Sequence, residues 1–105
     1  MVHAVNDESF MQEVMQAGLP VLVDFYADWC GPCRMVGPVV ERLSAEYEGK
    51  IKFCKVNVDE CPAVSQAFKI MSIPMLAFIK DGKMVDQIVG AVPRNTIAAK
   101  LDTLL

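Results

Sequence analysis

Apolar side chains follow two patterns along the chain, helical spacing and short continuous runs, and each pattern predicts one kind of secondary structure. Spacings of three or four residues are typical of a helix with one buried face, and a proline is well tolerated at the first position of a helix. These two signals predict helices over residues 7–17, 33–47, 62–68 and 93–105. The first helix is expected to be capped by Asn6 or Asp7 and to stop at Gly18. Pro38 lies inside the second helix and predicts a kink, because proline lacks the amide hydrogen that an α-helix uses.

Runs of β-branched and aromatic residues lie between these helices and predict strands. The strand candidates are residues 2–5, 21–27, 51–58, 75–79 and 84–89. Apart from Asp24, the second candidate is apolar on both faces, as a central strand covered on both sides requires. Asp81-Gly82 separates the last two candidates and is a strong hairpin signal, so these two strands should pair antiparallel. The pattern predicts an α/β fold with a mixed sheet of four or five strands and about four flanking helices.

The composition is that of a single folded domain, which we expect to span residues 1–105. Hydrophobic residues make up 53% of the chain and charged residues 22%, which is enough apolar material for one packed core. The formal net charge of −3 gives no broad positive field, so we expect neither nucleic acid nor anionic lipid as a partner. No apolar run reaches the ~20 residues that cross a bilayer, and the first residues lack the pattern of a secretory signal. We therefore expect a cytoplasmic monomer that acts on proteins or small molecules.

Two of the four cysteines lie close together, in the segment Trp29-Cys30-Gly31-Pro32-Cys33. This segment joins a predicted buried strand to the start of a long predicted helix, where open α/β sheets place their ligands. A helix N-terminus stabilises a thiolate through its free N–H groups and partial positive charge, so Cys30 is the expected nucleophile. The spacing lets Cys33 resolve a mixed disulfide on Cys30, and the pair therefore predicts dithiol–disulfide exchange.

The same segment resembles the active site of the thioredoxin family, and the resemblance covers nearly the whole chain. Asp24, Pro38 and Lys55 stand where that family has a buried carboxylate, a helix kink and a strand lysine near the carboxylate. Ile73-Pro74 matches the family's cis-proline loop. The resemblance implies a thioredoxin fold and a protein-disulfide reductase that carries electrons in cell redox homeostasis. It implies no bound cofactor and no metal.

Roles for individual residues also follow from the resemblance. Asp24, desolvated in an apolar strand, should have a raised pKa and exchange a proton with Cys33, while Lys55 tunes that carboxylate. Pro32, between the two cysteines, is the residue found there in the reducing members of the family, whereas isomerases and strong oxidants of the same fold usually have histidine or another residue. The implied partners are proteins with disulfides and a thioredoxin reductase that restores the dithiol. The resemblance also implies a substrate groove, in which the backbone of Ile73 pairs with substrate like an added strand. The groove residues are Trp29, Gly31, Pro32, Ile73, Pro74, Gly90 and Ala91.

Two other classes of function compete with this interpretation. Cys33 and Cys54 have a spacing that some zinc ribbons use, but six residues separate Cys54 from Cys61 where a zinc ribbon has two. A redox-inert binding module would keep the fold without the chemistry, and insulin reduction distinguishes that module from a reductase. Tyr26 and Met75 depart from the tryptophan and threonine common in the family, which would alter partner choice without changing the chemistry.

The remaining sulfur-containing residues are expected to serve the core. Cys54 lies in a predicted strand and is interpreted as a small buried hydrophobe. Cys61 precedes Pro62 at a predicted helix start, where a partly exposed thiol is either incidental or open to oxidation and glutathionylation. The methionines at apolar positions are predicted to fill the core, and among them only Met75 is expected to contact substrate. These methionines are Met11, Met15, Met35, Met71, Met75 and Met84.

Overall fold

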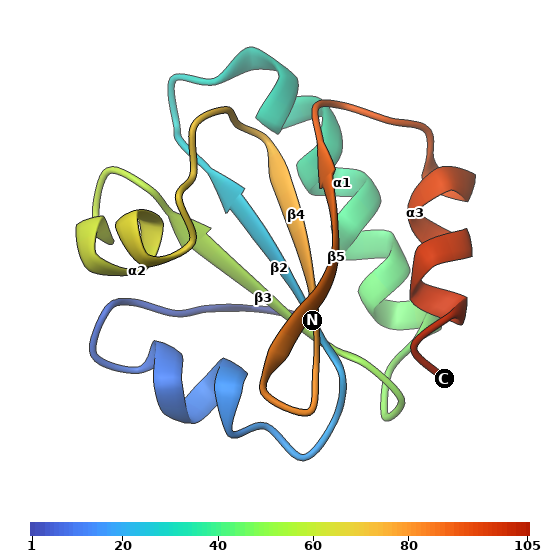
Figure 1. Ribbon diagram of the computed structural model, residues 1–105. Coiled ribbons are helices and arrows are strands. Elements are labelled where there is room, and N and C mark those ends of the chain that lie inside the picture. Colours follow the sequence, from blue (N-terminus) through green and yellow to red (C-terminus); the bar gives the residue numbers. More distant parts are fainter.

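The computed structural model describes residues 1–105 as a five-stranded sheet with helices on both faces (Figure 1). Its strands are β1 (Val2–Ala4), β2 (Val21–Tyr26), β3 (Lys52–Asn57), β4 (Met75–Lys80) and β5 (Lys83–Val89). Its helices are η1 (Met11–Met15), α1 (Gly31–Glu46), α2 (Pro62–Ala67) and α3 (Arg94–Asp102). The α/β class predicted from the sequence is confirmed. None of these helices has the length and hydrophobicity needed to cross a membrane.

The sheet has the strand order β1-β3-β2-β4-β5 and is mixed, as predicted. Strands β1, β3 and β2 run parallel, whereas β4 is antiparallel to both β2 and β5. The turn between β4 and β5 has positive φ at both Asp81 (54°) and Gly82 (74°), which matches the right-handed twist of a tight hairpin. The central strand β2 therefore has a neighbour on each edge, and the helices cover both of its faces, which explains why its sequence is almost wholly apolar and all but its last residue are buried.

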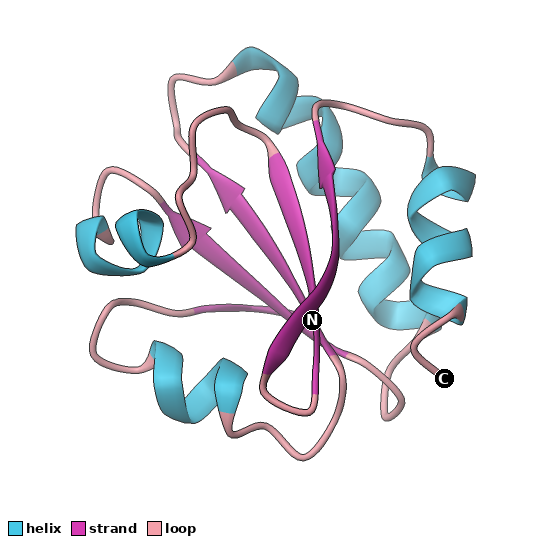
Figure 2. Cartoon of the chain, viewed as in Figure 1, coloured by secondary structure: helices cyan, strands magenta, loops and turns pink.

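Side chains of the sheet alternate between two apolar cores, one on each face. Figure 2 shows α1 and α3 on one side of the strands and the other two helices on the opposite side. The core under η1 and α2 includes Phe10, Val14, Val23, Phe25 and Val64. The core under α1 and α3 includes Leu22, Val40, Leu43, Ile97 and Leu101. Because successive side chains on a strand point to opposite faces, Asp24 lies on the same face as Leu22, beneath α1.

The first helix differs from the prediction of a regular helix over residues 7–17. Asn6 Oδ1 accepts the N–H groups of Glu8 and Ser9 at 3.0 and 2.9 Å, so Asn6 caps the turn that leads into the helix, while Phe10, the residue before η1, makes no side-chain cap. However, the regular part, η1, covers only Met11–Met15, and Gln16 N donates to the Met11 oxygen five residues back. Turns widened in this way belong to a π-helix, whose apolar spacing in so short a segment looks like that of an α-helix.

Asp7 has a different partner from the one predicted. Its carboxylate accepts the N–H groups of Ala63 (3.1 Å) and Val64 (2.9 Å), which are free donors in the first turn of α2. The side chain therefore caps α2, although α2 lies more than fifty residues further along the chain. This link holds the loop before η1 against α2.

The burial predicted from the sequence is wrong for four methionines and for Cys61. Four methionines predicted to fill the core are exposed, at fractions of 42 to 94%, because they lie on outward helix faces, in a loop and on an edge strand: Met11, Met35, Met71 and Met84. Cys61 was expected to be partly exposed, yet it is 2% exposed because it lies under the loop that carries Val5. Cys54 is fully buried, as predicted.

Candidate active site

The cysteine pair lies where β2 leads into α1. Cys30 is the residue before the first turn of α1, with extended backbone angles, and Cys33 lies in that first turn. The two residues form a disulfide with a Cα–Cα distance of 5.3 Å, so the structure shows the oxidised form. The backbone N–H of Cys33 points at Cys30 Sγ at 3.2 Å. The helix N-terminus therefore directs a hydrogen-bond donor at the sulfur that the sequence predicts to be the nucleophile.

The loop before β4 lies against the same sulfur. The carbonyl oxygen of Ile73 is 3.9 Å from Cys30 Sγ, and the Ile73–Pro74 peptide bond is cis, as the resemblance implies. The carbonyl of Pro74 accepts the N–H of Gly90 at 2.8 Å. Gly90 has φ of 98°, a backbone conformation that favours glycine. The structure thus places Ile73 against Cys30 and ties the adjacent Pro74 to Gly90, although these residues are distant from Cys30 in the sequence.

Trp29 directly precedes Cys30 and has a largely exposed side chain. Its side chain is 68% exposed, and Nε1 donates to Asp59 Oδ2 at 2.8 Å. Arg34 donates to the carbonyl of Asp28 through Nε and one terminal nitrogen, at 3.2 and 2.8 Å, which ties the loop to α1. Sequence reasoning missed both Asp59 and Arg34. The position of Asp59 just after β3 was the available signal, because the carboxyl ends of parallel strands meet at one edge of a sheet.

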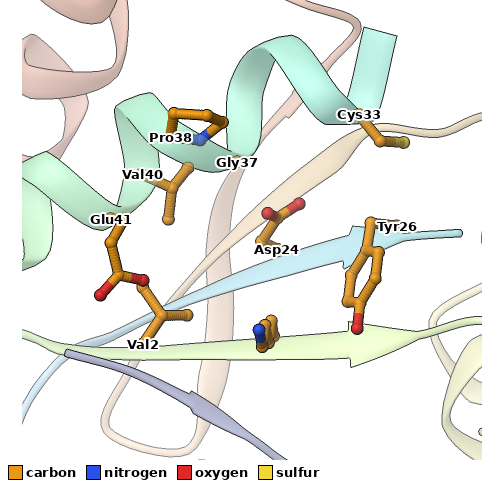
Figure 3. Close-up of a pocket in the computed structure, with 9 residues that line it drawn as sticks. Val2, Asp24, Tyr26, Cys33, Gly37, Pro38, Val40 and Glu41 are labelled. Carbon is orange, nitrogen blue, oxygen red and sulfur yellow. The ribbon is translucent and has the colours of Figure 1, made fainter. Parts of the chain in front are cut away.

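Asp24 is buried behind the disulfide, at 5% exposure. Figure 3 shows its carboxylate pointing from β2 toward α1, on the side where Cys33 also lies. Asp24 is paired in the sheet register with Lys55 on β3, and its Oδ1 has no hydrogen-bond partner. Burial raises the pKa of Asp24 from 3.8 to about 6, and the positive charge of Lys55 partly opposes that rise. The predicted direction of this pKa shift is confirmed.

A cavity of about 280 Å³ connects these groups. Its walls are formed by Val2, Asp24, Tyr26, Cys33, Gly37, Pro38, Val40, Glu41 and Lys55. Tyr26 and Glu41 were not predicted to lie near Asp24. The cavity has both apolar and polar walls, and Asp24, Cys33 and the exposed Glu41 all line it.

The structure does not assemble the cluster that a zinc ribbon needs. Cys33 is bonded to Cys30, whereas Cys54 and Cys61 belong to the core on the opposite face of the sheet. No three side chains of the His, Cys, Asp or Glu type lie close enough to hold a metal ion. Burial raises the pKa of the Cys54 thiol to about 11. The pKa of Cys61 is also raised, first by burial and then by Asp7 and Glu60.

The fold and the helix-terminal disulfide together define a thiol–disulfide oxidoreductase built on an α/β sheet. The family model described as Thioredoxin matches residues 1–103. The chain belongs to the thioredoxin family, whose members exchange a dithiol for a disulfide in proteins. The redox-inert binding module is thereby set aside. Members of this family generally act on proteins that contain disulfides and are themselves reduced again by a reductase.

Named relatives agree with this assignment. "Thioredoxin 1" of Synechococcus elongatus is 54% identical over 99 residues, covering 94% of this chain and 92% of that protein. "Thioredoxin" of Synechocystis sp. is 52% identical over 101 residues, covering 96% of this chain and 94% of the relative. "Thioredoxin M-type, chloroplastic" of Chlamydomonas reinhardtii is 46% identical over 102 residues, covering 97% of this chain and 73% of that protein. The similarity extends over the whole fold and is not confined to the cysteine segment.

Proposed function

We propose that the protein reduces protein disulfides with Cys30 as nucleophile and Cys33 as resolving cysteine. The observation that carries this assignment is the different surroundings of the two sulfurs. Cys30 Sγ lies beside the exposed loop at Ile73 and faces the N–H of Cys33. Cys33 instead lines the internal cavity that contains Asp24. Both cysteines are nearly buried in the disulfide form, at 4 and 5% exposure, so the assignment depends on what lies beside each sulfur. We infer that a substrate sulfur arrives from the loop side at Cys30, and that a proton is removed on the cavity side at Cys33.

The proposed reaction has two exchanges. The Cys30 thiolate attacks one sulfur of the substrate disulfide, and a Cys30–substrate bond forms as the other substrate sulfur leaves as a thiolate and takes up a proton. Cys33 then loses its proton and attacks Cys30 Sγ, which releases the second substrate thiolate. The substrate disulfide gains two electrons and two protons, and the protein ends with the Cys30–Cys33 disulfide seen in the structure.

Asp24 is the proposed proton acceptor for Cys33, directly or through water in the cavity. A carboxylate with a pKa of about 6 is partly ionised near neutral pH, so it can both take up and release a proton there. Its unpartnered Oδ1 is free to accept that proton or a water. Lys55 is proposed to tune the reaction by favouring the ionised carboxylate, which is the form able to act as base.

The proposed substrate groove runs over the exposed rim of the pair. Neither the N–H nor the carbonyl of Ile73 bonds to another backbone group, so both are free to pair with an extended substrate segment. Trp29 offers a large exposed apolar face beside the disulfide. The other proposed groove residues are Gly31, Pro32, Pro74, Gly90 and Ala91.

The finer assignments of partner and compartment are also proposals. Each cycle leaves Cys30 and Cys33 oxidised, so turnover requires an external reductant, which we propose to be thioredoxin reductase. We propose a cytoplasmic monomer in which no cofactor takes part. The net charge of −3 supports proteins over nucleic acids and membranes as partners.

Insulin reduction tests the proposed function. The reduced protein should cleave insulin disulfides, and a thioredoxin reductase with NADPH should sustain the reaction, followed as NADPH oxidation. The Cys30→Ser variant should be inactive in both assays. Activity retained by Cys30→Ser, or an inactive wild-type protein, would show that the chain is not a reductase of this kind.

A further inference from the structure

Met71 is the most exposed large apolar side chain of the protein, at 94%. It lies in the loop between α2 and β4, which Figure 1 places at the same end of the sheet as the loop between β2 and α1. Trp29 and Val89 are also exposed, at 68 and 54%. Single exposed apolar residues are ordinary, but a cluster beside a binding site indicates a contact surface.

Two pockets meet at Met71. The first, which we call the Trp29 pocket, has a volume of about 190 Å³ and includes Trp29, Ile70, Met71 and Ile73. The second, the Lys69 pocket, has a volume of about 200 Å³ and includes Lys69, Ile70, Met71 and Val89. An apolar cavity of ~150 Å³ can hold a benzene ring, so each pocket has room for one side chain. Ile70, Met71 and Ser72 line both pockets, and we call Met71, the most exposed of the apolar residues, the ridge between them.

The Trp29 pocket is linked to the reacting disulfide through Ile73. Ile73 belongs to its wall, and the carbonyl of the same residue is 3.9 Å from Cys30 Sγ. An extended segment attached through its cysteine to Cys30 and lying along the loop passes Ile73 first and then Met71. Lys69 lies four residues before Ile73, and the chain bends at residues 72–74 and turns at Lys69, so the loop is more compact than a strand. An extended segment of a few residues therefore has the length to reach Lys69.

The charge at the far end of this path is unpaired. Lys69 is exposed and takes part in none of the three ion pairs of the structure. The Trp29 end is acidic, since Asp59 bonds to the indole. A partner segment that crosses the ridge therefore meets a cation only at the Lys69 pocket, where an acidic side chain is the complementary group.

We propose that Met71 selects among disulfide-bearing substrates by favouring a segment in which the attacked cysteine is followed or preceded by an apolar side chain and then an acidic one. The apolar side chain fills a pocket against Met71, whose unbranched, flexible thioether adapts to different shapes. The acidic side chain pairs with Lys69. This inference rests on the proposed function, because it specifies the substrate that the Cys30 site accepts.

Three symmetric peptides test the proposal, each used as its disulfide-linked dimer. They are Glu-Leu-Gly-Cys-Gly-Leu-Glu, Gln-Leu-Gly-Cys-Gly-Leu-Gln and Gln-Ser-Gly-Cys-Gly-Ser-Gln, and their symmetry makes the chain direction irrelevant. Single-turnover rates of the reduced protein should fall in that order. Replacing leucine by serine should cost at least about tenfold, the lower end of the effect of removing one methylene from an apolar pocket. Replacing glutamate by glutamine should cost less, and this difference should shrink at high salt.

Matched variants assign these differences to the two residues. Met71→Ser should reduce the leucine preference, whereas Met84→Ser, at the far end of β5, should keep it. Lys69→Glu should abolish the glutamate preference, whereas Lys50→Glu, which changes the net charge equally, should keep it. Equal wild-type rates on all three peptides, or preferences unchanged in Met71→Ser and Lys69→Glu, would overturn the proposal and leave the reductase intact. A wild-type protein that reduces none of the peptides and no insulin would overturn the proposed function itself.

Discussion

Asp24 and Lys55 occupy the same register position on two adjacent parallel strands, yet Asp24 Oδ1 has no hydrogen-bond partner. The lysine acts on the carboxylate through its charge, and that effect is smaller than the effect of burial. The protein therefore keeps a destabilised carboxylate next to Cys33. Replacing this carboxylate by an amide should separate its cost to the fold from its use in the reaction.

Asp24→Asn should stabilise the protein at neutral and alkaline pH. The pKa of Asp24 is raised in the folded state from 3.8 to about 6, so the native state binds more protons, and wild-type stability falls as pH rises through this window. Above pH ~6 the penalty is complete, and a shift of this size corresponds to on the order of 3 kcal/mol. Urea unfolding of both oxidised proteins should show a gain for Asp24→Asn at pH 8 that shrinks toward pH 4.

The same variant should resolve mixed disulfides more slowly, because Cys33 loses its proton acceptor. Insulin-reduction rates across pH measure this effect alongside the unfolding curves. An unchanged rate together with lower stability at pH 8 would mean that Asp24 has a purely structural role.

Cys33→Ser should accumulate a covalent adduct with a protein substrate, since the variant keeps the nucleophile and lacks the resolving thiol. Cys30→Ser should form none, because the remaining thiol lies on the cavity side of the pair. Non-reducing gel electrophoresis after mixing with a disulfide-containing protein, followed by peptide mass mapping, identifies the linked cysteine. Equal adducts on both variants would contradict the assignment of roles.

The free cysteines should prove chemically silent in the folded protein. Cys54 and Cys61 are both buried, and the pKa of each thiol is raised. The oxidised native protein should therefore not react with a thiol reagent at pH 8, and unfolding in urea should expose two thiols. The double variant Cys54→Ala, Cys61→Ser should reduce insulin at nearly the wild-type rate. A large loss of rate would point instead to a regulatory role for one of these thiols.

Asp7→Ala should destabilise the protein by about 1 kcal/mol, the typical effect of removing a carboxylate that caps a helix. Two N–H groups of α2 lose their acceptor in this variant. Urea midpoints compared with those of Glu8→Ala, a neighbouring exposed carboxylate, measure the loss. If the two variants lose equal stability, general surface charge rather than capping is the cause.

The features that sequence predicts well here depend on local pattern. Strand β2 is a continuous β-branched and aromatic run, and helix α1 has clear helical periodicity. Asp81-Gly82 has turn chemistry of its own, and the cysteine pair is contiguous with a helix start. The cis peptide at Ile73–Pro74 was predicted only through the family resemblance, because nothing in the local sequence decides between the two isomers of a peptide bond before proline.

The features that sequence missed depend on neighbours far along the chain. Asp7 caps α2 instead of its own helix, and Cys61 is buried by the segment at Val5. Met71 has an apolar side chain in a position that no element covers. In each case the residue type fits two environments equally well, and only the packing of remote segments decides between them.

The position of Asp24 on β2 also limits how this region of the chain can change in length. Side chains alternate faces along the strand. If one residue were inserted or deleted between Val21 and Asp24, and the residues before it kept their pairing, the carboxylate would point to the opposite face. It would then enter the core that contains Val23 and Phe25. The ladder with β3 and β4 resists such a slip on both edges. Homologous or engineered chains should therefore accept substitutions in this stretch far more readily than insertions or deletions.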